Sequence, residues 1–192
     1  REKLGKEVAS RNVTIFDNGR MPYGLRSALV DDEGCPTSVR SLVENGVLKS
    51  FFYDSYNALI VGSEPTGNGF RRSTRTIEGA YSRPAQCSPS NLELVPGSKP
   101  LDELVSEVER GIVVYKFAYP DVDPVTGSFA LEIRNAVLVE NGSEKGPIKH
   151  AILVGNFYKA LFNITGLSRE TEVHGSVKAP YARIEGLELV GS

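Results

Sequence analysis

Apolar and polar positions alternate along two stretches of the chain, residues 37–43 and 128–139, as they do in half-buried β-strands. Each stretch runs into the same five residues, Leu-Val-Glu-Asn-Gly, at 42–46 and again at 138–142. Asn-Gly after an apolar run is a strong local signal for a hairpin, because a type I′ turn needs positive φ at both central residues. The pattern therefore predicts two similar β-hairpins.

The rest of the pattern predicts further strands and few helices. The expected return strands of the two hairpins are residues 47–53 and 148–154, and residues 173–178 and 182–190 read as the last strands. Four more segments are assigned. Residues 91–95 and 112–119 are strands, 157–164 is a candidate short helix, and 56–61 is either strand or short helix.

The clearest helix is predicted from Pro100 to Arg110. Asp102 and Glu103 lie near the positive end of its dipole, and Gly111 suits the position just after its end. Its apolar residues recur with helical spacing on one face, at Leu101, Leu104, Val105 and Val108.

These elements predict a strand-rich α+β fold with largely antiparallel sheets, two similar β-hairpins and one or two short helices, because most strands are joined by tight turns. We expect a single domain over residues 1–192. Two related hairpin halves, at about 13–97 and 112–192, are bridged by the helix 100–110. The chain begins with Arg1 and its only methionine is Met21, so we expect an N-terminal domain that this sequence does not contain.

Composition narrows the function classes. The net charge is −2 and the isoelectric point about 5.8, whereas a protein that binds the phosphate backbone generically carries a basic excess. No apolar run approaches the roughly 20 residues of a membrane helix, and no signal peptide precedes the first strand, so a cytoplasmic location is expected. Two cysteines, Cys35 and Cys87, are too few for a disulfide framework.

Two short motifs allow a structural and a functional interpretation. The carboxylates of Asp31, Asp32 and Glu33 could bind a hard cation, but no further ligand spacing supports this, and an acidic turn is the better interpretation. The segment Thr66-Gly67-Asn68-Gly69 lacks the lysine and glycine spacing of a phosphate loop, so its glycines favour a turn or close backbone approach. Substrate binding by Thr66, Gly67, Asn68, Gly69, Asp32 and Glu33 is the functional alternative.

The basic and nucleophilic residues give weaker signals. Arg71, Arg72 and Arg75 beside Phe70 could contact nucleic acid, although arginines in an acidic chain are more often solvated or ion-paired. His150 and His174 are the only histidines, and nothing near them has the ligand spacing of a zinc site. A serine or cysteine nucleophile with a distant histidine base stays open, but no residue marks it out.

Nine segments, in order and covering nearly the whole chain, carry a resemblance to a known family. They are Gly5–Ser10, Asp31–Thr37, Leu42–Lys49, Thr66–Gly69, Ser90–Leu94, Pro96–Gly97, Glu109–Gly111, Val122–Phe129 and Gly186–Gly191. The ordered set resembles the C-terminal domain of the TldD/PmbA (TldD/TldE) family. That resemblance implies a subunit of a zinc-dependent peptidase complex that acts on unfolded peptides.

The resemblance also implies where the chemistry lies. In TldD-type subunits an H-E-x-x-x-H helix in the preceding domain and a cysteine near the C-terminus bind zinc, whose bound water attacks the peptide. This chain has neither motif: the region of the cysteine reads His174-Gly175-Ser176. The chain therefore looks closer to the PmbA/TldE branch, which lacks the metal motif. The expectation is no catalytic residue, no metal ligand and no cofactor on this chain, with zinc on a TldD-type partner subunit.

Three hypotheses follow. The first is a PmbA/TldE-like C-terminal domain that serves dimerisation, with a TldD-like subunit or a second copy, and shapes a groove for unfolded peptide by pairing with sheet edges. The second is a DNA gyrase modulator-type binding module without peptidase role, supported only by the arginine cluster. The third is an autonomous enzyme that uses His150 or His174. The first predicts no membrane partner and makes nucleic acid an unlikely one.

Overall fold

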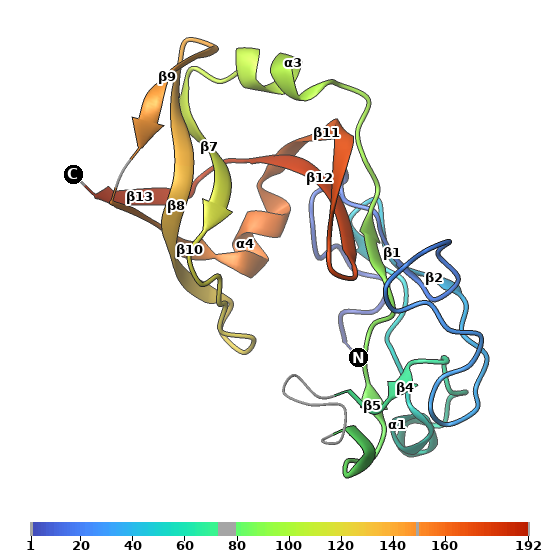
Figure 1. Cartoon of the computed structure of the whole chain (residues 1–192). Helices are drawn as coiled ribbons and strands as arrows, with labels where there is room; N and C mark the ends of the chain where they lie inside the picture. The colour runs from blue at the N-terminus through green and yellow to red at the C-terminus, as the bar shows by residue number, and fades with distance from the viewer. Residues whose placement is uncertain (1, 73–79, 149, 192) are drawn as a thin grey trace.

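The chain folds into two main β-sheets and a small two-stranded ribbon (Figure 1). The computed structural model describes residues 2–72, 80–148 and 150–191. The six-stranded sheet has the order β11 (Ile164–His174), β12 (Val177–Ile184), β6 (Leu92–Leu94), β1 (Ile15–Asn18), β2 (Val39–Glu44), β3 (Val47–Leu48). The five-stranded sheet has the order β13 (Glu188–Gly191), β10 (Ala151–Asn156), β8 (Ser128–Glu140), β7 (Arg110–Phe117), with β9 (Ser143–Ile148) paired to β8. The ribbon is β4 (Gly69–Phe70) with β5 (Gln86–Cys87).

Short helices connect these strands. They are α1 (Ser55–Val61), α3 (Leu101–Ser106) and α4 (Phe157–Phe162) among the described residues. Most strand pairs are antiparallel, and β12 with β6 is parallel. The strand-rich α+β class with largely antiparallel sheets is therefore confirmed. In Figure 1, α4 lies between the two sheets, whereas α1 lies with the ribbon at the far end of the molecule.

Both predicted hairpins form, with the predicted turn. Asn45 and Gly46 have φ of 48° and 79°, and Asn141 and Gly142 have φ of 50° and 70°. These positive values are those of a type I′ turn, which suits the right-handed twist of the flanking strands. The turns join β2 to β3 and β8 to β9.

The return strands are shorter than predicted. The first was expected over residues 47–53, but β3 ends at Leu48 because the chain leaves the sheet edge to enter α1. The second was expected over 148–154, but it is β9, residues 143–148, and residues 151–156 form the separate strand β10. Because β8 is 13 residues long, it pairs with β9 near its end and with β10 near its start.

The helix predicted from Pro100 to Arg110 is also too long. The helix α3 covers Leu101–Ser106, and β7 begins at Arg110. The carbonyls of Val108 and Glu109 accept hydrogen bonds from Gly142 N and Asn141 N, at 2.8 and 2.7 Å. Residues 108–110 therefore belong to the contact with the turn of the second hairpin and to the start of β7, and not to the helix.

The ambiguous segment and the candidate short helix both form helices, and the C-terminal strands differ from the prediction. Residues 56–61 belong to a helix, α1, and the short helix predicted over 157–164 is α4. The strands expected at 173–178 and 182–190 are instead the long hairpin β11–β12, which turns at Gly175, followed by β13. The sequence pattern missed β11 because its residues 169–174 are mostly exposed and polar.

Each sheet has its own apolar cluster. Val13, Val43, Ile164 and Leu167 are among the buried residues against the six-stranded sheet, and Ile133, Ala136 and Ala151 are buried in the five-stranded one. The expected second half, 112–192, contributes β11 and β12 to the sheet that contains the first hairpin. No helix of the described residues is long and apolar enough to cross a membrane.

Candidate functional site

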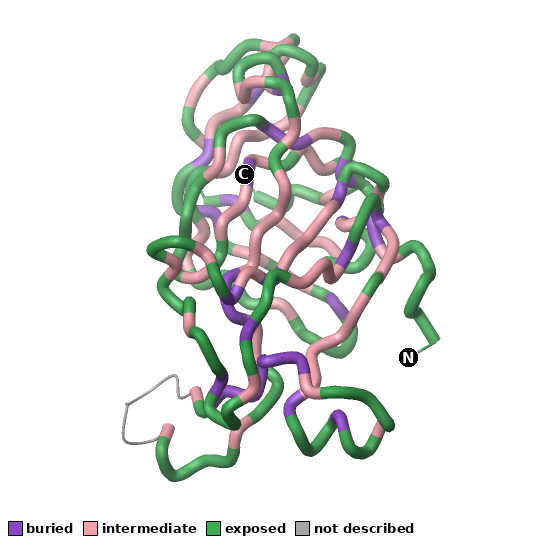
Figure 2. The backbone as a smooth tube through the Cα atoms, turned by 90° about the vertical axis from the view of Figure 1, so that its right-hand side faces the viewer, coloured by how far each residue is buried: buried purple, intermediate pink, exposed green. Residues whose placement is uncertain are grey.

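The glycine segment Thr66-Gly67-Asn68-Gly69 is buried along its whole length, and it belongs to a buried stretch that continues to Phe70. Figure 2 shows such buried stretches as purple runs between green exposed loops. Gly67 has φ of 72°, and a Cβ there would lie 2.2 Å from the carbonyl oxygen of Pro36. Only glycine fits such a left-handed, closely approached position. The structural interpretation of these glycines is supported, and substrate contact stays a prediction.

The polar side chains of this segment bond to one another and to the first strand. Asn68 Nδ2 donates to Asp17 Oδ2 at 2.7 Å and to the carbonyl of Ser88 at 3.2 Å. Thr66 Oγ1 donates to Asn68 Oδ1 at 2.8 Å and accepts from Tyr53 N at 2.9 Å. Buried polar groups need such partners, because an unpaired one costs about 1–3 kcal/mol. The segment therefore ties β1 to the connection that precedes α1.

Asp17 is the buried charge at the centre of this network. Its residue is 2% exposed, and Asp17 Oδ1 accepts from Ser90 N at 2.7 Å. Burial raises the pKa of this carboxyl above its usual value, and the hydrogen bonds from Asn68 and Ser90 oppose that rise. The network is therefore sensitive to the protonation of one side chain.

The acidic turn uses its carboxylates to accept N–H groups. Asp31 Oδ1 accepts from Glu33 N and Cys35 N at 3.0 and 2.9 Å, and Asp31 Oδ2 accepts from Gly69 N at 2.8 Å. Asp32 Oδ2 accepts from Arg71 N at 2.6 Å. These bonds support an acidic turn that braces the glycine segment.

Glu33 reaches in a different direction. Glu33 Oε2 accepts from Ser55 N and Ser55 Oγ at 2.7 and 3.0 Å, at the start of α1. The structure thus brings all six predicted substrate-binding residues into one connected cluster with Asp17 and Asp31. Thr66 and Asn68 direct their polar atoms inward, and Asp32 and Glu33 are exposed.

The arginine cluster is only partly free for a nucleic-acid backbone. Arg72 Nη1 donates to Ser88 Oγ and to the carbonyl of Pro89, and its guanidinium carbon lies 4.0 Å from the centroid of the Phe70 ring. Burial, followed by the nearby Arg26, lowers the pKa of Arg72 to about 10. Arg75 lies outside the described residues. Arg72 therefore acts as a brace between two loops.

The thiols are poorly suited to nucleophilic attack. Cys87 Sγ accepts from Asp54 N at 3.2 Å, and Cys35 is partly buried beside Asp31. Burial raises the pKa of both thiols, and the charge of neighbouring carboxylates raises it further, whereas a reactive cysteine needs its pKa lowered. Neither has a histidine among its hydrogen-bond partners in the described part of the chain.

His174 lies near the end of the β11–β12 hairpin with a carboxylate and a phenol. Its Nε2 is 2.9 Å from Glu172 Oε2, and Tyr181 Oη donates to Glu172 Oε1. The pKa of Glu172 is lowered, by the Tyr181 hydrogen bond first and then by His174. A zinc site takes at least three protein ligands, and the described residues contain no group of three His, Cys, Asp or Glu that could hold a metal. These residues do not fit zinc by themselves.

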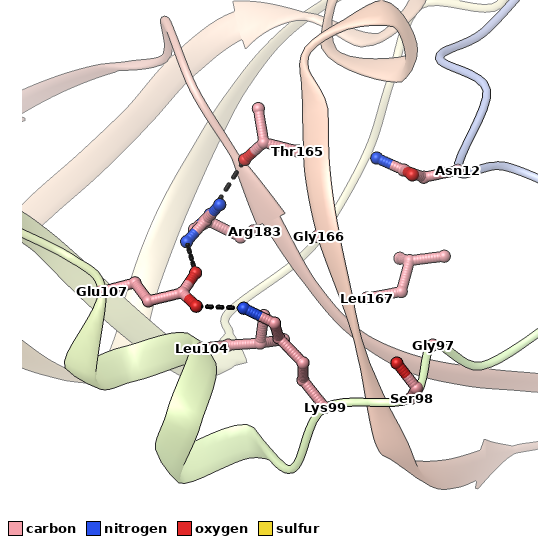
Figure 3. A pocket seen from close by; sticks show the side chains of 10 residues that line it. All are labelled: Asn12, Gly97, Ser98, Lys99, Leu104, Glu107, Thr165, Gly166, Leu167 and Arg183. Carbon is pink, nitrogen blue, oxygen red and sulfur yellow. Dashed lines mark hydrogen bonds and ion pairs between the residues drawn. The ribbon is translucent and has the colours of Figure 1, made fainter.

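Sequence reasoning missed a cavity of about 230 Å³ between α3 and the β11–β12 hairpin (Figure 3). Leu104, Gly166 and Leu167 supply its apolar wall, and polar groups surround them. The remaining lining residues are Asn12, Gly97, Ser98, Lys99, Glu107, Thr165 and Arg183. The lining comes from four separate parts of the chain, near residues 12, 97–107, 165–167 and 183, so the apolar face of α3 was the one sequence signal for this surface.

Glu107 joins the two cations of the cavity. Its carboxylate bonds Lys99 Nζ, and Arg183 Nη1 donates to Glu107 Oε2 at 2.6 Å. Arg183 Nε also donates to Thr165 Oγ1 at 2.9 Å, so the guanidinium is held across the hairpin, as Figure 3 shows. The bond to Lys99, and then that to Arg183, lowers the pKa of Glu107, whose charge is therefore kept at neutral pH. Ser98, next to Lys99 in the chain, also lines the cavity.

Comparison with known proteins identifies this arrangement of strands. Residues 1–191 match the family described as PmbA/TldA metallopeptidase C-terminal domain. The Metalloprotease TldD homolog of Buchnera aphidicola is 34% identical over 84% of this chain, which spans 32% of that relative. A putative modulator of a DNA gyrase from Thermotoga maritima has a TM-score of 0.87 and 33% identity, covering 98% of this chain and 41% of its own.

A third comparison comes from the archaea. The crystal structure of TldE from Thermococcus kodakarensis has a TM-score of 0.86 and 31% identity, covering 98% of this chain and 42% of its own. The chain spans about a third of the length of the curated TldD relatives that it matches. TldD-named and TldE-named proteins are similar to it at comparable identity, so the comparisons give the family and leave its branch open.

Proposed function

The chain belongs to the TldD/PmbA metallopeptidase family as a C-terminal domain, and from this premise we propose that it serves a PmbA/TldE-like subunit. In this proposal the subunit acts in the cytoplasm with a TldD-like subunit or a second copy. The domain contributes pairing and part of a groove for unfolded peptide. Zinc, and the attack on the peptide bond, belong to the TldD-type partner.

The branch assignment rests on the end of the β11–β12 hairpin. Where the TldD branch is expected to carry Cys-Gly-Lys, this chain has His174-Gly175-Ser176. His174 bonds Glu172 there, and Gly175 has φ of 60° in the turn. The fold similarity to a TldE structure is compatible with this assignment.

The observation that carries the peptide-groove proposal is the cavity between α3 and β11–β12. Its apolar wall of Leu104 and Leu167 suits a small apolar side chain. Among the lining residues, Lys99 and Arg183 share the single carboxylate of Glu107, so one positive charge is left over for the polar groups of a peptide or its carboxylate end. A volume of about 230 Å³ is the size of one residue and not of a large cofactor. Sequence-tolerant binding needs such shallow, mixed contacts.

Peptide cleavage in the presence of a TldD-type subunit tests the proposal. We expect the chain, in the context of its subunit, to form a complex in size-exclusion chromatography and to raise cleavage of an unfolded peptide. Ser98→Phe, which fills the cavity mouth, should raise the KM for peptide several-fold with little change in complex formation. Ser143→Phe, at an exposed position of β9, is the matched control.

Two results would overturn the proposal. One is an absence of complex and of any effect on cleavage. The other is a Ser98→Phe variant that cleaves as well as the Ser143→Phe control, which would remove the cavity from the groove. The DNA gyrase alternative gains no support from the brace formed by Arg72, and it would need DNA affinity that falls steeply with salt.

A further inference from the structure

The guanidinium of Arg183 has unused hydrogen-bond donors in the cavity between α3 and the β11–β12 hairpin. Its Nε donates to Thr165 Oγ1 at 2.9 Å, and its Nη1 donates to Glu107 Oε2 at 2.6 Å. A guanidinium carries N–H groups on Nε and on both Nη atoms, and no described residue accepts a hydrogen bond from Nη2. Because Arg183 lines the cavity and its side chain is 26% exposed, these donors are accessible to a ligand there.

The neighbours of Arg183 fix the direction of those donors. Thr165 belongs to β11 and Arg183 to β12, so the bond between them spans the hairpin, and Glu107 follows the end of α3. Lys99 Nζ bonds the other carboxylate oxygen of Glu107 and lies 3.3 Å from Oε1 of Glu103, which is outside the cavity lining. Lys99 is therefore already shared between two carboxylates. Arg183 is the cation of the cavity with donors to spare, and it is oriented before a ligand arrives.

The shape and charge of the cavity select the kind of ligand. A free guanidinium edge matches the planar geometry of a carboxylate, and the lining residues carry a net charge of +1. Figure 3 shows Leu167, an apolar lining residue, on the other side of the cavity from Arg183 and Glu107. Every unfolded peptide has a carboxylate at its C-terminus, whereas acidic side chains depend on its sequence. A site that tolerates many sequences therefore gains most from the terminal carboxylate.

We propose that this cavity binds the C-terminal carboxylate of a peptide, with Arg183 as the residue that recognises it and Glu107 as a positioning residue. The carboxylate accepts from the Nη2 edge of the guanidinium, while Thr165 and Glu107 hold the rest of the group. The side chain of the last peptide residue packs on Leu104 and Leu167. Because Glu107 repels a second carboxylate, it also limits the affinity. The proposal rests on the peptide-groove part of the proposed function and names the part of the peptide that the cavity takes.

A pair of peptides that differ only at the C-terminus tests the proposal. A fluorescein-labelled alanine hexapeptide ending in valine is made with a free carboxylate and with an amide. Fluorescence anisotropy is measured on the whole subunit that contains this chain, without the partner subunit. We expect the carboxylate form to bind about tenfold more tightly at low salt, because charged hydrogen bonds are stronger than neutral ones. The preference should shrink as the salt concentration rises. An amidated peptide with a glutamate inside it should bind like the amide.

Three variants separate recognition from positioning. Arg183→Met should bring the two peptides to equal affinity, and Arg183→Lys should keep only part of the preference, because lysine has the charge without the planar fork. Glu107→Gln keeps an acceptor for Arg183 Nη1 and removes the competing charge, so it should strengthen binding of the carboxylate peptide several-fold and leave the amide unchanged. Lys145→Met, which removes a cation at an exposed position of β9, is the control and should change neither.

Each arm has an outcome that overturns the proposal. These outcomes are equal affinity for the two peptides, a preference that survives Arg183→Met, and a Glu107→Gln variant that binds the carboxylate peptide more weakly. Urea denaturation shows whether each variant is folded, and if Arg183→Met is not, the peptide comparison and Glu107→Gln decide. All three outcomes leave the proposed function in place, because its own tests, complex formation and the effect of Ser98→Phe on cleavage, are read with an amidated peptide.

Discussion

The hairpin β2–β3 and the hairpin β8–β9 share the sequence Leu-Val-Glu-Asn-Gly and the same turn, and they lie in different sheets. In each, a preceding segment bonds the backbone of the turn: Gly46 N donates to Val13 O, and Gly142 N donates to Val108 O, both at 2.8 Å. The local sequence therefore sets the conformation of the turn. In both hairpins the turn also binds the backbone of an earlier segment through the same glycine N–H.

The surroundings of the two hairpins differ in polarity. Beyond the first hairpin lies the network of Asp17, Thr66 and Asn68, three buried polar side chains. Each hairpin adjoins an apolar cluster, with Val43 in the first and Ala136 in the second, but no described residue of the five-stranded sheet is a buried polar one. The same turn thus occurs beside a buried polar network in one sheet and without one in the other, so it specifies chain reversal and not the chemistry around it.

The largest expected effect comes from replacing the turn glycines, which tests whether the two turns are equivalent. Gly46→Ala and Gly142→Ala place a Cβ 2.5 Å from the carbonyl oxygen of Ala9 and 2.3 Å from that of Ser106, at positive φ. Each should lower the free energy of unfolding by about 2–4 kcal/mol, measured by urea denaturation. Gly146→Ala, where a Cβ meets nothing within 4 Å, is the control and should change it by less than about 1 kcal/mol. A cost at only one of the two turns would break the equivalence.

The second largest expected effect is a difference between the two regions in how the free energy of unfolding depends on pH. Burial raises the pKa of Asp17, so this carboxyl adds most stability below its unfolded pKa and loses it as the pH rises through its folded value. Asp17→Asn should cost about 1–3 kcal/mol in acid, and the gap from the unsubstituted protein should narrow as the pH rises. Urea denaturation at several pH values gives both numbers.

Asp123, in the loop before β8, supplies the control of opposite sign. Hydrogen bonds from Thr126 N and then Val125 N lower the pKa of Asp123, so its stabilisation is present above the unfolded pKa and is lost as the pH falls. The gap between the unsubstituted protein and Asp123→Asn should therefore widen as the pH rises. A gap for Asp17→Asn that also widens would show that hydrogen bonds, and not burial, decide the titration of Asp17.

Structure that depends on neighbouring residues could be predicted from the sequence, and structure that depends on distant contacts could not. Asn-Gly turns and the helix α4 follow from signals within a few residues, and both were predicted. The end of α3 was not, because Val108 and Glu109 bond a turn more than thirty residues later in the chain. The site was harder still: Asp17 and Asn68 are 51 residues apart, and the parallel pairing of β12 with β6 joins distant segments. Local patterns contain no information about which polar side chains such pairings bring together.

The smallest expected effect comes from the one hydrogen-bond acceptor that differs between the two turns. Asn45 N donates to the side-chain Oγ1 of Thr14 at 3.0 Å, whereas Asn141 N donates to the backbone carbonyl of Glu109 at 2.7 Å. Thr14→Val keeps the shape and removes the acceptor, so it should cost about 0.5–1.5 kcal/mol. Glu109→Ala leaves the carbonyl in place and should change the free energy of unfolding by less than about 0.5 kcal/mol. Equal losses for the two variants would mean that side-chain packing, and not the bond to the turn, fixes the hairpins, because Thr14→Val removes the acceptor of its turn and Glu109→Ala does not.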